Sequence, residues 1–425
     1  MTPLSYFPYR NGTLHAEAVP LPKLALEFGT PSFVYSRNAL REAWATYRHA
    51  AGDRDVLVCY GMKANSNLAI LNEFKELGAG FDIVSGGELA RVLAVGADPA
   101  QVVFSGVGKQ VWEMQAALRA GVKCFNVESE AELDRLAAVA RDLGLPARAS
   151  VRVNPDVDAQ THPYISTGLK ENKFGIPIDR AEAVYRRAAS LKGCIEVVGV
   201  DCHIGSQISE VDPYLGALDK LLALIARLGS QGIELRHLDL GGGLGIRYKD
   251  EQPLAPRALL ERVFERLDAS GLGHLQVVLE PGRSLVGNAG ILLTRVQYLK
   301  HNDARNFAIV DAAMNDLLRP TLYGAWHDVV AVAPPPPDAV RANVYDIVGP
   351  VCESGDWLAR DRRLAVRQDD LLAILSAGAY GFSMASQYNT RARAAEIMVD
   401  ASAYRVVRPR ETIESLFSGE STWAP

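Results

Sequence analysis

The sequence predicts an α/β protein built from a (β/α)8 barrel and a separate all-β domain. Three observations lead to this fold class. Eight short apolar runs alternate with helical stretches between about residues 55 and 280, after residue 283 the pattern changes to short runs rich in β-branched residues, and polar residues cluster where the apolar runs end. The chain has 425 residues, which exceeds the roughly 250–300 residues that one hydrophobic core supports.

The eight apolar runs are the expected barrel strands. They occupy residues 56–60, 81–84, 101–106, 124–127, 149–154, 197–205, 237–243 and 276–282. Amphipathic stretches separate most of them, and in residues 212–229 the apolar side chains Leu215, Leu218 and Leu222 recur on one helical face. Strands that alternate with helices predict a parallel sheet. An open doubly wound sheet fits this pattern too, but polar residues at the ends of many strands favour a barrel, whose strand ends converge on one face.

The residues after 283 predict an all-β domain, either a sandwich or a barrel. Its expected strands are 290–300, 306–312, 343–349, 371–375 and 395–400. The first 35 residues also have a strand and loop pattern but cannot form a core alone, so we expect them to join this domain. The predicted domains are therefore a barrel over 36–283 and a β domain made of 1–35 and 284–425.

Composition excludes several classes of protein. Hydrophobic residues make up 48% and charged residues 22%, which is typical of a globular chain. The net charge of −5 predicts no nucleic-acid surface. Five cysteines without a CxxC pair predict neither a disulfide framework nor a structural metal site. No basic and apolar leader and no run near the roughly 18 apolar residues of a membrane span occur, so we expect a cytoplasmic protein with no membrane partner.

Lys63 lies in the segment CYGMKANSN, directly after the first apolar strand. Most lysines are solvated surface residues. At the mouth of a barrel, however, desolvation can lower the pKa of a lysine, and such a lysine can form a Schiff base with a carbonyl. An aldolase lysine and a pyridoxal phosphate (PLP) lysine both fit this position.

Three further strand ends carry residues suited to an anionic ligand. His203 is followed by Gly205 and Ser206, although a core histidine explains it equally well. The three glycines 241–243 let backbone N–H groups approach a phosphate, although a tight turn needs them as well. Glu280 can keep a pyridine nitrogen protonated and Arg283 can bind a carboxylate, the alternative being a turn with a surface ion pair.

The β domain contains a second group of candidates. Arg319 and Tyr323 are four residues apart, Cys352 and Glu353 follow a Gly-Pro turn, and Tyr380 lies between glycines. Each has an ordinary explanation as a surface arginine, a packed tyrosine or a buried cysteine. Their joint occurrence in non-helical turns is more suggestive than any one of them.

Taken together, the motifs resemble the fold-type III PLP-dependent decarboxylases, and among these the diaminopimelate decarboxylases. The resemblance covers nearly the whole chain. It rests on CYGMKANSN, FDIVSGGEL, NPDVDAQTHPYISTG, ENKFGI, HIGSQI, GGGLGI, EPGR, CES and GAYG, in this order. One departure is DAAMND, where a glycine is expected at Ala312 or Ala313. The resemblance implies a PLP-binding barrel with a β domain, which agrees with the fold predicted from the strand pattern.

The resemblance also implies a role for each candidate residue. The implied catalytic residues are Lys63, Cys352, His203 and Glu280. The implied cofactor-binding residues are Lys63, Asp82, His203, Ser206, Gly242, Gly243, Glu280, Gly282, Arg283 and Tyr380. The implied substrate-binding residues are Arg283, Arg319, Tyr323, Glu353 and Tyr380. In this scheme Lys63 holds PLP covalently, Glu280 pairs with the ring nitrogen, and Cys352 protonates the substrate carbon after CO2 leaves.

The implied reaction is decarboxylation of meso-2,6-diaminopimelate to L-lysine, the last step of lysine biosynthesis. The implied assembly is a homodimer in which Cys352 and Glu353 serve the partner's site. The alternatives are an ornithine or arginine decarboxylase, an alanine racemase, and a non-catalytic PLP-binding homologue. Glu280 argues against the racemase, which leaves the ring nitrogen unprotonated, and the presence of Lys63 and Cys352 argues against a non-catalytic homologue.

Overall fold

The computed structural model describes residues 4–158, 168, 172–336 and 340–423. The chain divides into two compact units. The barrel unit consists of Ala43–Ile246 and Gln252–Leu285, and the β unit consists of Met1–Glu42, Arg247–Glu251 and Val286–Pro425. The short segment Arg247–Glu251 therefore belongs to the β unit although it lies between two parts of the barrel in the sequence.

Eight parallel strands form the barrel and confirm the predicted fold class. They are β5 (Val56–Gly61), β6 (Gly80–Ile83), β7 (Val102–Phe104), β8 (Cys124–Val127), β9 (Ala147–Asn154), β11 (Ile195–Asp201), β12 (His237–Asp239) and β13 (Gln276–Leu279). Each strand pairs with the next one, and β13 pairs with β5, which closes the ring. The short strand β10 (Ile176–Pro177) adds to β9. Several predicted strands were too long at their C-terminal ends, because the residues after Asp201 and Asp239 turn into loops.

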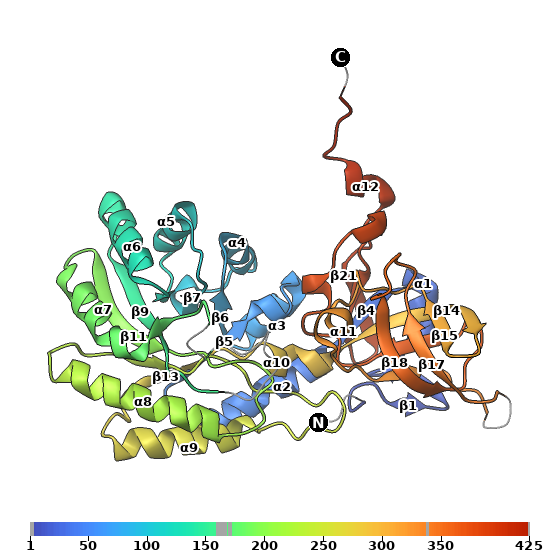
Figure 1. The fold of residues 1–425 in the computed structure, drawn as a ribbon, viewed down its shortest axis with the longest axis horizontal. Helices are drawn as coiled ribbons and strands as arrows, with labels where there is room; N and C mark the ends of the chain where they lie inside the picture. Colours follow the sequence, from blue (N-terminus) through green and yellow to red (C-terminus); the bar gives the residue numbers. More distant parts are fainter. Residues whose placement is uncertain (1–3, 159–167, 169–171, 337–339, 424–425) are drawn as a thin grey trace. The chain divides into compact units, whose positions relative to one another are not determined.

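Helices surround the strands of the barrel unit (Figure 1). They are α3 (Leu68–Glu76), α4 (Gly86–Ala94), α5 (Val111–Ala120), α6 (Glu130–Leu143), α7 (Ile178–Ser190), α8 (Asp212–Gly229) and α9 (Pro256–Ala269). Helix α2 (Arg37–Ala51) begins in the β unit and ends in the barrel unit. The side chains of Asn67, Ser85 and Ser129 accept hydrogen bonds from the first turns of α3, α4 and α6. In α8 the predicted apolar face, including Leu215, Leu218 and Leu222, is buried.

Small and apolar side chains of the barrel strands, among them Cys59, Cys124 and Val198, form a buried cluster, and Gly199 on β11 makes room for His237. A Cβ added to Gly199 would lie 2.1 Å from the ring nitrogen Nε2 of His237. His237 is itself buried, and its Nε2 lies 3.9 Å from the Cys124 sulfur. The ring therefore has little space to retreat.

We expect Gly199→Ala to destabilise the protein by about 1–3 kcal/mol, because an extra methyl group in a filled core forces side chains or backbone to shift. Gly216 is a matched control, since it lies in α8 and an added Cβ there meets no atom within 4 Å. Gly216→Ala should be neutral or stabilise the helix by up to about 1 kcal/mol. Equilibrium unfolding in urea measures both, and equal stabilities of the two variants would contradict the packing argument.

The β unit is built on a mainly antiparallel sheet in the order β18-β17-β15-β14-β4-β20-β21, with β19 pairing β14 and β16. Its strands are β4 (Ser32–Ser36), β14 (Gly290–His301), β15 (Asn306–Val310), β16 (Val329–Ala331), β17 (Asn343–Val348), β18 (Trp357–Leu364), β19 (Leu371–Ile374), β20 (Ala395–Asp400) and β21 (Ala403–Arg408). Strand β4 lies between β14 and β20, so the N-terminal segment is part of this sheet.

Smaller elements complete the β unit. A three-stranded sheet is formed by β1 (Tyr9–Arg10), β2 (Thr13–Ala16) and β3 (Val19–Pro20), and the short helices are α1 (Leu21–Phe28), α11 (Arg319–Tyr323) and α12 (Ile413–Phe417), with α10 (Arg283–Val286) at the junction with the barrel unit. The β unit thus confirms a β-sheet domain separate from the barrel.

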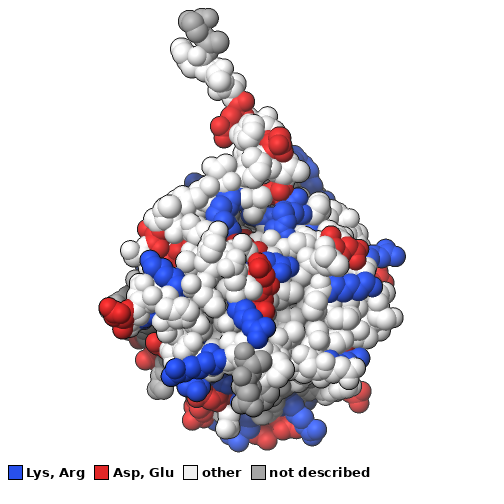
Figure 2. Space-filling view, turned by 90° about the vertical axis from the view of Figure 1, so that its right-hand side faces the viewer, with Lys and Arg blue, Asp and Glu red and all other residues white. Residues whose placement is uncertain are grey.

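Charges of both signs are interspersed over the face drawn in Figure 2. Within the β unit, Arg37 pairs with Asp400 and Arg393 pairs with Glu411. None of the helices in the described part of the chain is both long enough and apolar enough to span a membrane.

Candidate active site

Lys63 lies at the C-terminal end of β5, as predicted. The strand ends at Gly61, and a single 3-10 turn, Met62–Ala64, carries the lysine. Its Nζ is 3.2 Å from Oδ2 of Asp82, which lies on the neighbouring strand β6. The Asp82 side chain is fully buried, whereas that of Lys63 is 39% exposed. The amine is therefore held in place by a buried carboxylate while remaining accessible from solvent.

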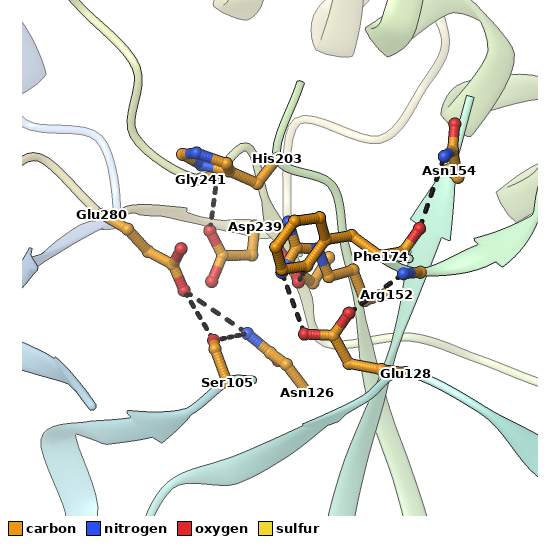
Figure 3. Close-up of polar contacts among 12 residues, drawn as sticks. Ser105, Asn126, Glu128, Arg152, Asn154, Phe174, His203, Asp239, Gly241 and Glu280 are labelled. Atoms are coloured by element: carbon orange, nitrogen blue, oxygen red, sulfur yellow. Dashed lines mark hydrogen bonds and ion pairs between the residues drawn. The ribbon is translucent and has the colours of Figure 1, made fainter. Parts of the chain in front are cut away.

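Glu280, which follows β13, belongs to a buried cluster of carboxyl groups. The other members are Asp201 at the end of β11 and Asp239 at the end of β12. Oxygen atoms of the three residues lie within 4.8 Å of one another. The Glu280 carboxyl is also 3.4 Å from Ser105 Oγ and from Asn126 Nδ2 (Figure 3). Within the described residues, one oxygen each of Asp82, Asp201 and Asp239 is buried without a hydrogen-bond partner.

Burial raises the pKa of the Glu280 carboxyl well above its usual range, and the nearby Asp239 and Asp82 raise it further. Burial and the charge of Asp239 likewise raise the pKa of Asp201, and burial raises the pKa of Asp239 to about 7. The physical cause is that several carboxylates cannot all be charged in so small a buried volume. The raised pKa values favour protonation within the cluster, and such a buried acid can share a proton with a ring nitrogen.

Arg152 on β9 provides the positive charge beside this cluster. Its guanidinium donates to Glu128 Oε1 at 2.9 Å, lies 3.8 Å from Asp201 and stacks over Phe174 at 4.9 Å (Figure 3). Arg152, Asp201 and Asp239 were not predicted as site residues from the sequence. The available signal was that each is a charged residue near the C-terminal end of a predicted barrel strand.

His203 follows β11 in the barrel unit, and its side chain is half-buried. Its Nδ1 accepts a hydrogen bond from the Gly242 N–H at 3.1 Å, so this nitrogen carries no proton in the neutral ring. Burial lowers the pKa of His203 well below its usual value, and the charges of Lys63 and Arg152 lower it further. The ring is thus a neutral, flat surface at the mouth of the barrel, as stacking on an aromatic cofactor requires.

The glycines at 241–243 form a loop that leaves no room for side chains. A Cβ on Gly242 would lie 2.2 Å from the Glu280 carbonyl oxygen, and one on Gly243 would lie 2.6 Å from the Gly205 carbonyl oxygen. Gly243 also has a φ of 105°, a conformation that favours glycine. Gly282 is similarly crowded, because a Cβ added there would lie 2.9 Å from the Gly61 carbonyl oxygen.

Arg283 and Ser206 complete this group in the barrel unit. Nη2 of the buried Arg283 donates to Ser206 Oγ at 3.0 Å. The neutral ring of His203 suits the PLP ring, and the buried acid Glu280 suits its nitrogen. The accessible amine of Lys63 suits the aldehyde, and the glycine loop beside the Ser206 hydroxyl suits the phosphate. The residues of the barrel unit therefore fit this cofactor, and the implied cofactor-binding residues other than Tyr380 lie together there.

The remaining candidates belong to the β unit. Arg319 and Tyr323 open and close α11, where Arg319 is buried and Tyr323 is half-buried. Cys352 and Glu353 lie in one exposed loop; the Cys352 N–H donates to Asn389 at 3.3 Å, and Glu353 accepts a hydrogen bond from Tyr388. Tyr380 is half-buried with a φ of 56°. The exposure of Cys352 removes its ordinary explanation as a packed core thiol.

Residues 159–167 of the NPDVDAQTHPYISTG motif and Glu171 of ENKFGI lie outside the described residues.

Comparison with known proteins identifies the class first. The model of the pyridoxal-dependent decarboxylases, pyridoxal binding domain, matches residues 37–287, which is more than half of the chain. Among curated relatives, the diaminopimelate decarboxylase of Pseudomonas aeruginosa is 60% identical over 98% of both chains, and that of Vibrio cholerae is 54% identical over 98% of this chain and 99% of its own. The chain therefore belongs to the diaminopimelate decarboxylase family.

Solved structures agree with this assignment. Diaminopimelate decarboxylase from Helicobacter pylori, complexed with L-lysine, is 41% identical to this chain and superimposes with a TM-score of 0.89 over 94% of this chain and 98% of its own. The enzyme from M. jannaschii, in co-complex with L-lysine, is 34% identical with a TM-score of 0.93 over 99% of both chains.

Proposed function

We propose that this protein decarboxylates meso-2,6-diaminopimelate to L-lysine and CO2 with PLP as its cofactor. The observation that carries the proposal is the placement of Lys63 beside Asp82 at the mouth of a barrel that also holds the buried Glu280. Relatives of nearly equal length that are named diaminopimelate decarboxylase support the choice of substrate. A cytoplasmic location belongs to the same proposal, since the reaction is biosynthetic.

PLP, when bound, supplies the electron sink on which an amino acid can lose CO2. In our proposal Lys63 binds the cofactor covalently through Nζ. Glu280 would accept the hydrogen bond of the protonated ring nitrogen, and the positive ring would offset the charges of Asp239 and Asp82 that raise the pKa of Glu280. His203 supports the face of the ring, while Ser206 and the glycine loop receive the phosphate.

The β unit supplies the groups that recognise the substrate in this proposal. Arg319 and Tyr323, with Arg283 of the barrel unit, bind a substrate carboxylate, Glu353 binds the distal ammonium, and Tyr380 contacts both cofactor and substrate. Cys352 delivers the proton that replaces CO2. We further propose a homodimer in which Cys352 and Glu353 of the partner subunit serve each active site, which is consistent with their position in an exposed loop.

The substrate is tested by measuring CO2 release from meso-diaminopimelate, ornithine and arginine in parallel. We expect kcat/KM for diaminopimelate to exceed that for ornithine by about 10²-fold or more, because ornithine lacks the distal carboxylate and leaves buried arginine charge unpaired. Equal or faster turnover of ornithine or arginine would instead assign the protein to the basic amino acid decarboxylases.

A further inference from the structure

His327 is a fully buried histidine of the β unit that lies outside the motifs of the family. It is in the loop that joins α11 to β16, with 0% of its surface exposed. Its Nδ1 is 2.8 Å from the carbonyl oxygen of Leu375, and its Nε2 is 2.8 Å from Nη1 of Arg319. A carbonyl oxygen can only accept a hydrogen bond, so Nδ1 carries the proton. The lone pair of Nε2 therefore accepts from the Arg319 guanidinium, and the imidazole is neutral.

Tyr248 holds the same guanidinium from its face. The Arg319 guanidinium carbon lies 4.6 Å from the centre of the Tyr248 ring, a distance typical of a cation–π contact. The Tyr248 ring also meets His327 edge to face, with ring centres 5.2 Å apart and planes at 76°. Tyr248 and the neighbouring Lys249 are held in a turn because both N–H groups donate to the Glu251 carboxylate, at 2.9 and 2.7 Å.

These two contacts orient Arg319 without cancelling its charge. A carboxylate in the place of His327 would neutralise the guanidinium, whereas a neutral imidazole and an aromatic face restrict its rotation and leave it positively charged toward an anionic ligand. Arg319 is only 6% exposed, so the entropy of ordering its side chain is lost on folding rather than on ligand binding. We expect such an arrangement for an arginine that is preorganised to bind an anion. An arginine with a purely structural role would gain little from it.

The chemistry of the reaction determines which carboxylate Arg319 binds. A carboxylate that leaves as neutral CO2 is hindered by a tight ion pair, because the ion pair stabilises the ground state more than the transition state. A permanently oriented arginine therefore suits the carboxylate that remains in the product. L-Lysine retains this carboxylate, and the corresponding diamine, cadaverine, lacks it.

We propose that His327 and Tyr248 are positioning residues that hold Arg319 in the orientation that binds the retained carboxylate of the substrate. This inference rests on the proposed function and extends it to two residues outside the implied site. His327 acts through its Nε2 lone pair and Tyr248 through its ring face, and neither touches the substrate.

The test compares His327→Phe, which removes the acceptor and keeps a ring, with His327→Gln, whose amide oxygen can still accept from Arg319. We expect His327→Phe to raise KM for diaminopimelate by about 10–100-fold, as for the loss of a hydrogen bond to a charged group, with a much smaller change in kcat. The Kd of the holoenzyme for L-lysine, measured by calorimetry, should rise by a similar factor, while the Kd for cadaverine stays within about twofold. His327→Gln should restore most of the lysine affinity.

Tyr248→Leu provides a second route that leaves the buried imidazole in place. It should weaken L-lysine binding about fivefold and spare cadaverine, and Tyr248→Phe, which keeps the ring face, should bind lysine like the wild type. Unchanged lysine affinity in both His327→Phe and Tyr248→Leu, or an equal loss of cadaverine affinity, would overturn the proposal. If wild-type protein fails to decarboxylate diaminopimelate but the lysine and cadaverine contrast holds, only the proposed substrate is wrong.

Discussion

Lys63→Ala is expected to abolish decarboxylation, lowering kcat by about 10⁴–10⁶-fold, as the removal of a covalent catalytic group does in other enzymes. The reason is that the amine at the end of β5 is the group positioned to bind the PLP aldehyde, held by Asp82 at 3.2 Å. The purified variant should also lack the yellow absorbance of lysine-bound PLP even when PLP is added. Both changes are read from CO2 release and from the visible spectrum.

A surface lysine provides the control for this experiment. Lys75 lies on α3 and pairs with the exposed Glu76, so Lys75→Ala should retain wild-type activity and colour. Circular dichroism should show the same fold in both variants. Substantial turnover by a correctly folded Lys63→Ala protein would show that another residue binds the cofactor.

The second large effect is expected for Cys352→Ala, which should lower kcat by about 10²–10⁴-fold, the range for losing a positioned general acid. The spectrum of bound PLP should remain, because the thiol delivers a proton and does not hold the cofactor. Cys194 is the matched control: it is a half-buried cysteine before β11, and Cys194→Ala should leave kcat unchanged. A wild-type rate in Cys352→Ala would move the proton-donor role to another group.

Mixing the two inactive variants tests whether the sites are shared. If Cys352 of the partner subunit serves the site that contains Lys63, random reassortment of Lys63→Ala and Cys352→Ala subunits should restore about a quarter of wild-type activity. The factor arises because half of the dimers are mixed and each mixed dimer regains one of its two sites. Activity that stays at the level of the separate variants would show that each subunit uses its own cysteine.

The barrel could be predicted from local patterns because its strands are apolar runs separated by amphipathic helices. The buried face of α8 follows from the spacing of Leu215, Leu218 and Leu222, and Lys63 is identifiable because it comes directly after β5. The strand ends were less predictable. The residues after Asp201 and Asp239 continue the apolar pattern, yet they leave the sheet to form the loops that carry His203 and the glycines.

Other features depend on residues that are distant in the sequence. Glu280 could be predicted from its motif, whereas Asp201, Asp239 and Arg152 could not. Strands β9, β11 and β12 bring these residues together, and the pKa of a buried carboxyl group is raised by burial and by the charges that folding places beside it. Arg319 was predicted as a substrate contact, whereas His327 and Tyr248 were not, because a histidine after a tryptophan and a tyrosine after an arginine carry no local signal.

The sequence by itself thus determined the fold class, the family and the order of the reactive residues along the chain, since periodicity and motifs are local properties. Only the tertiary structure decided which acids have a raised pKa, which tautomer His327 adopts, and that Arg247–Glu251 belongs to the β unit. These properties depend on distances between side chains and on the loss of water around them. Folding alone determines both.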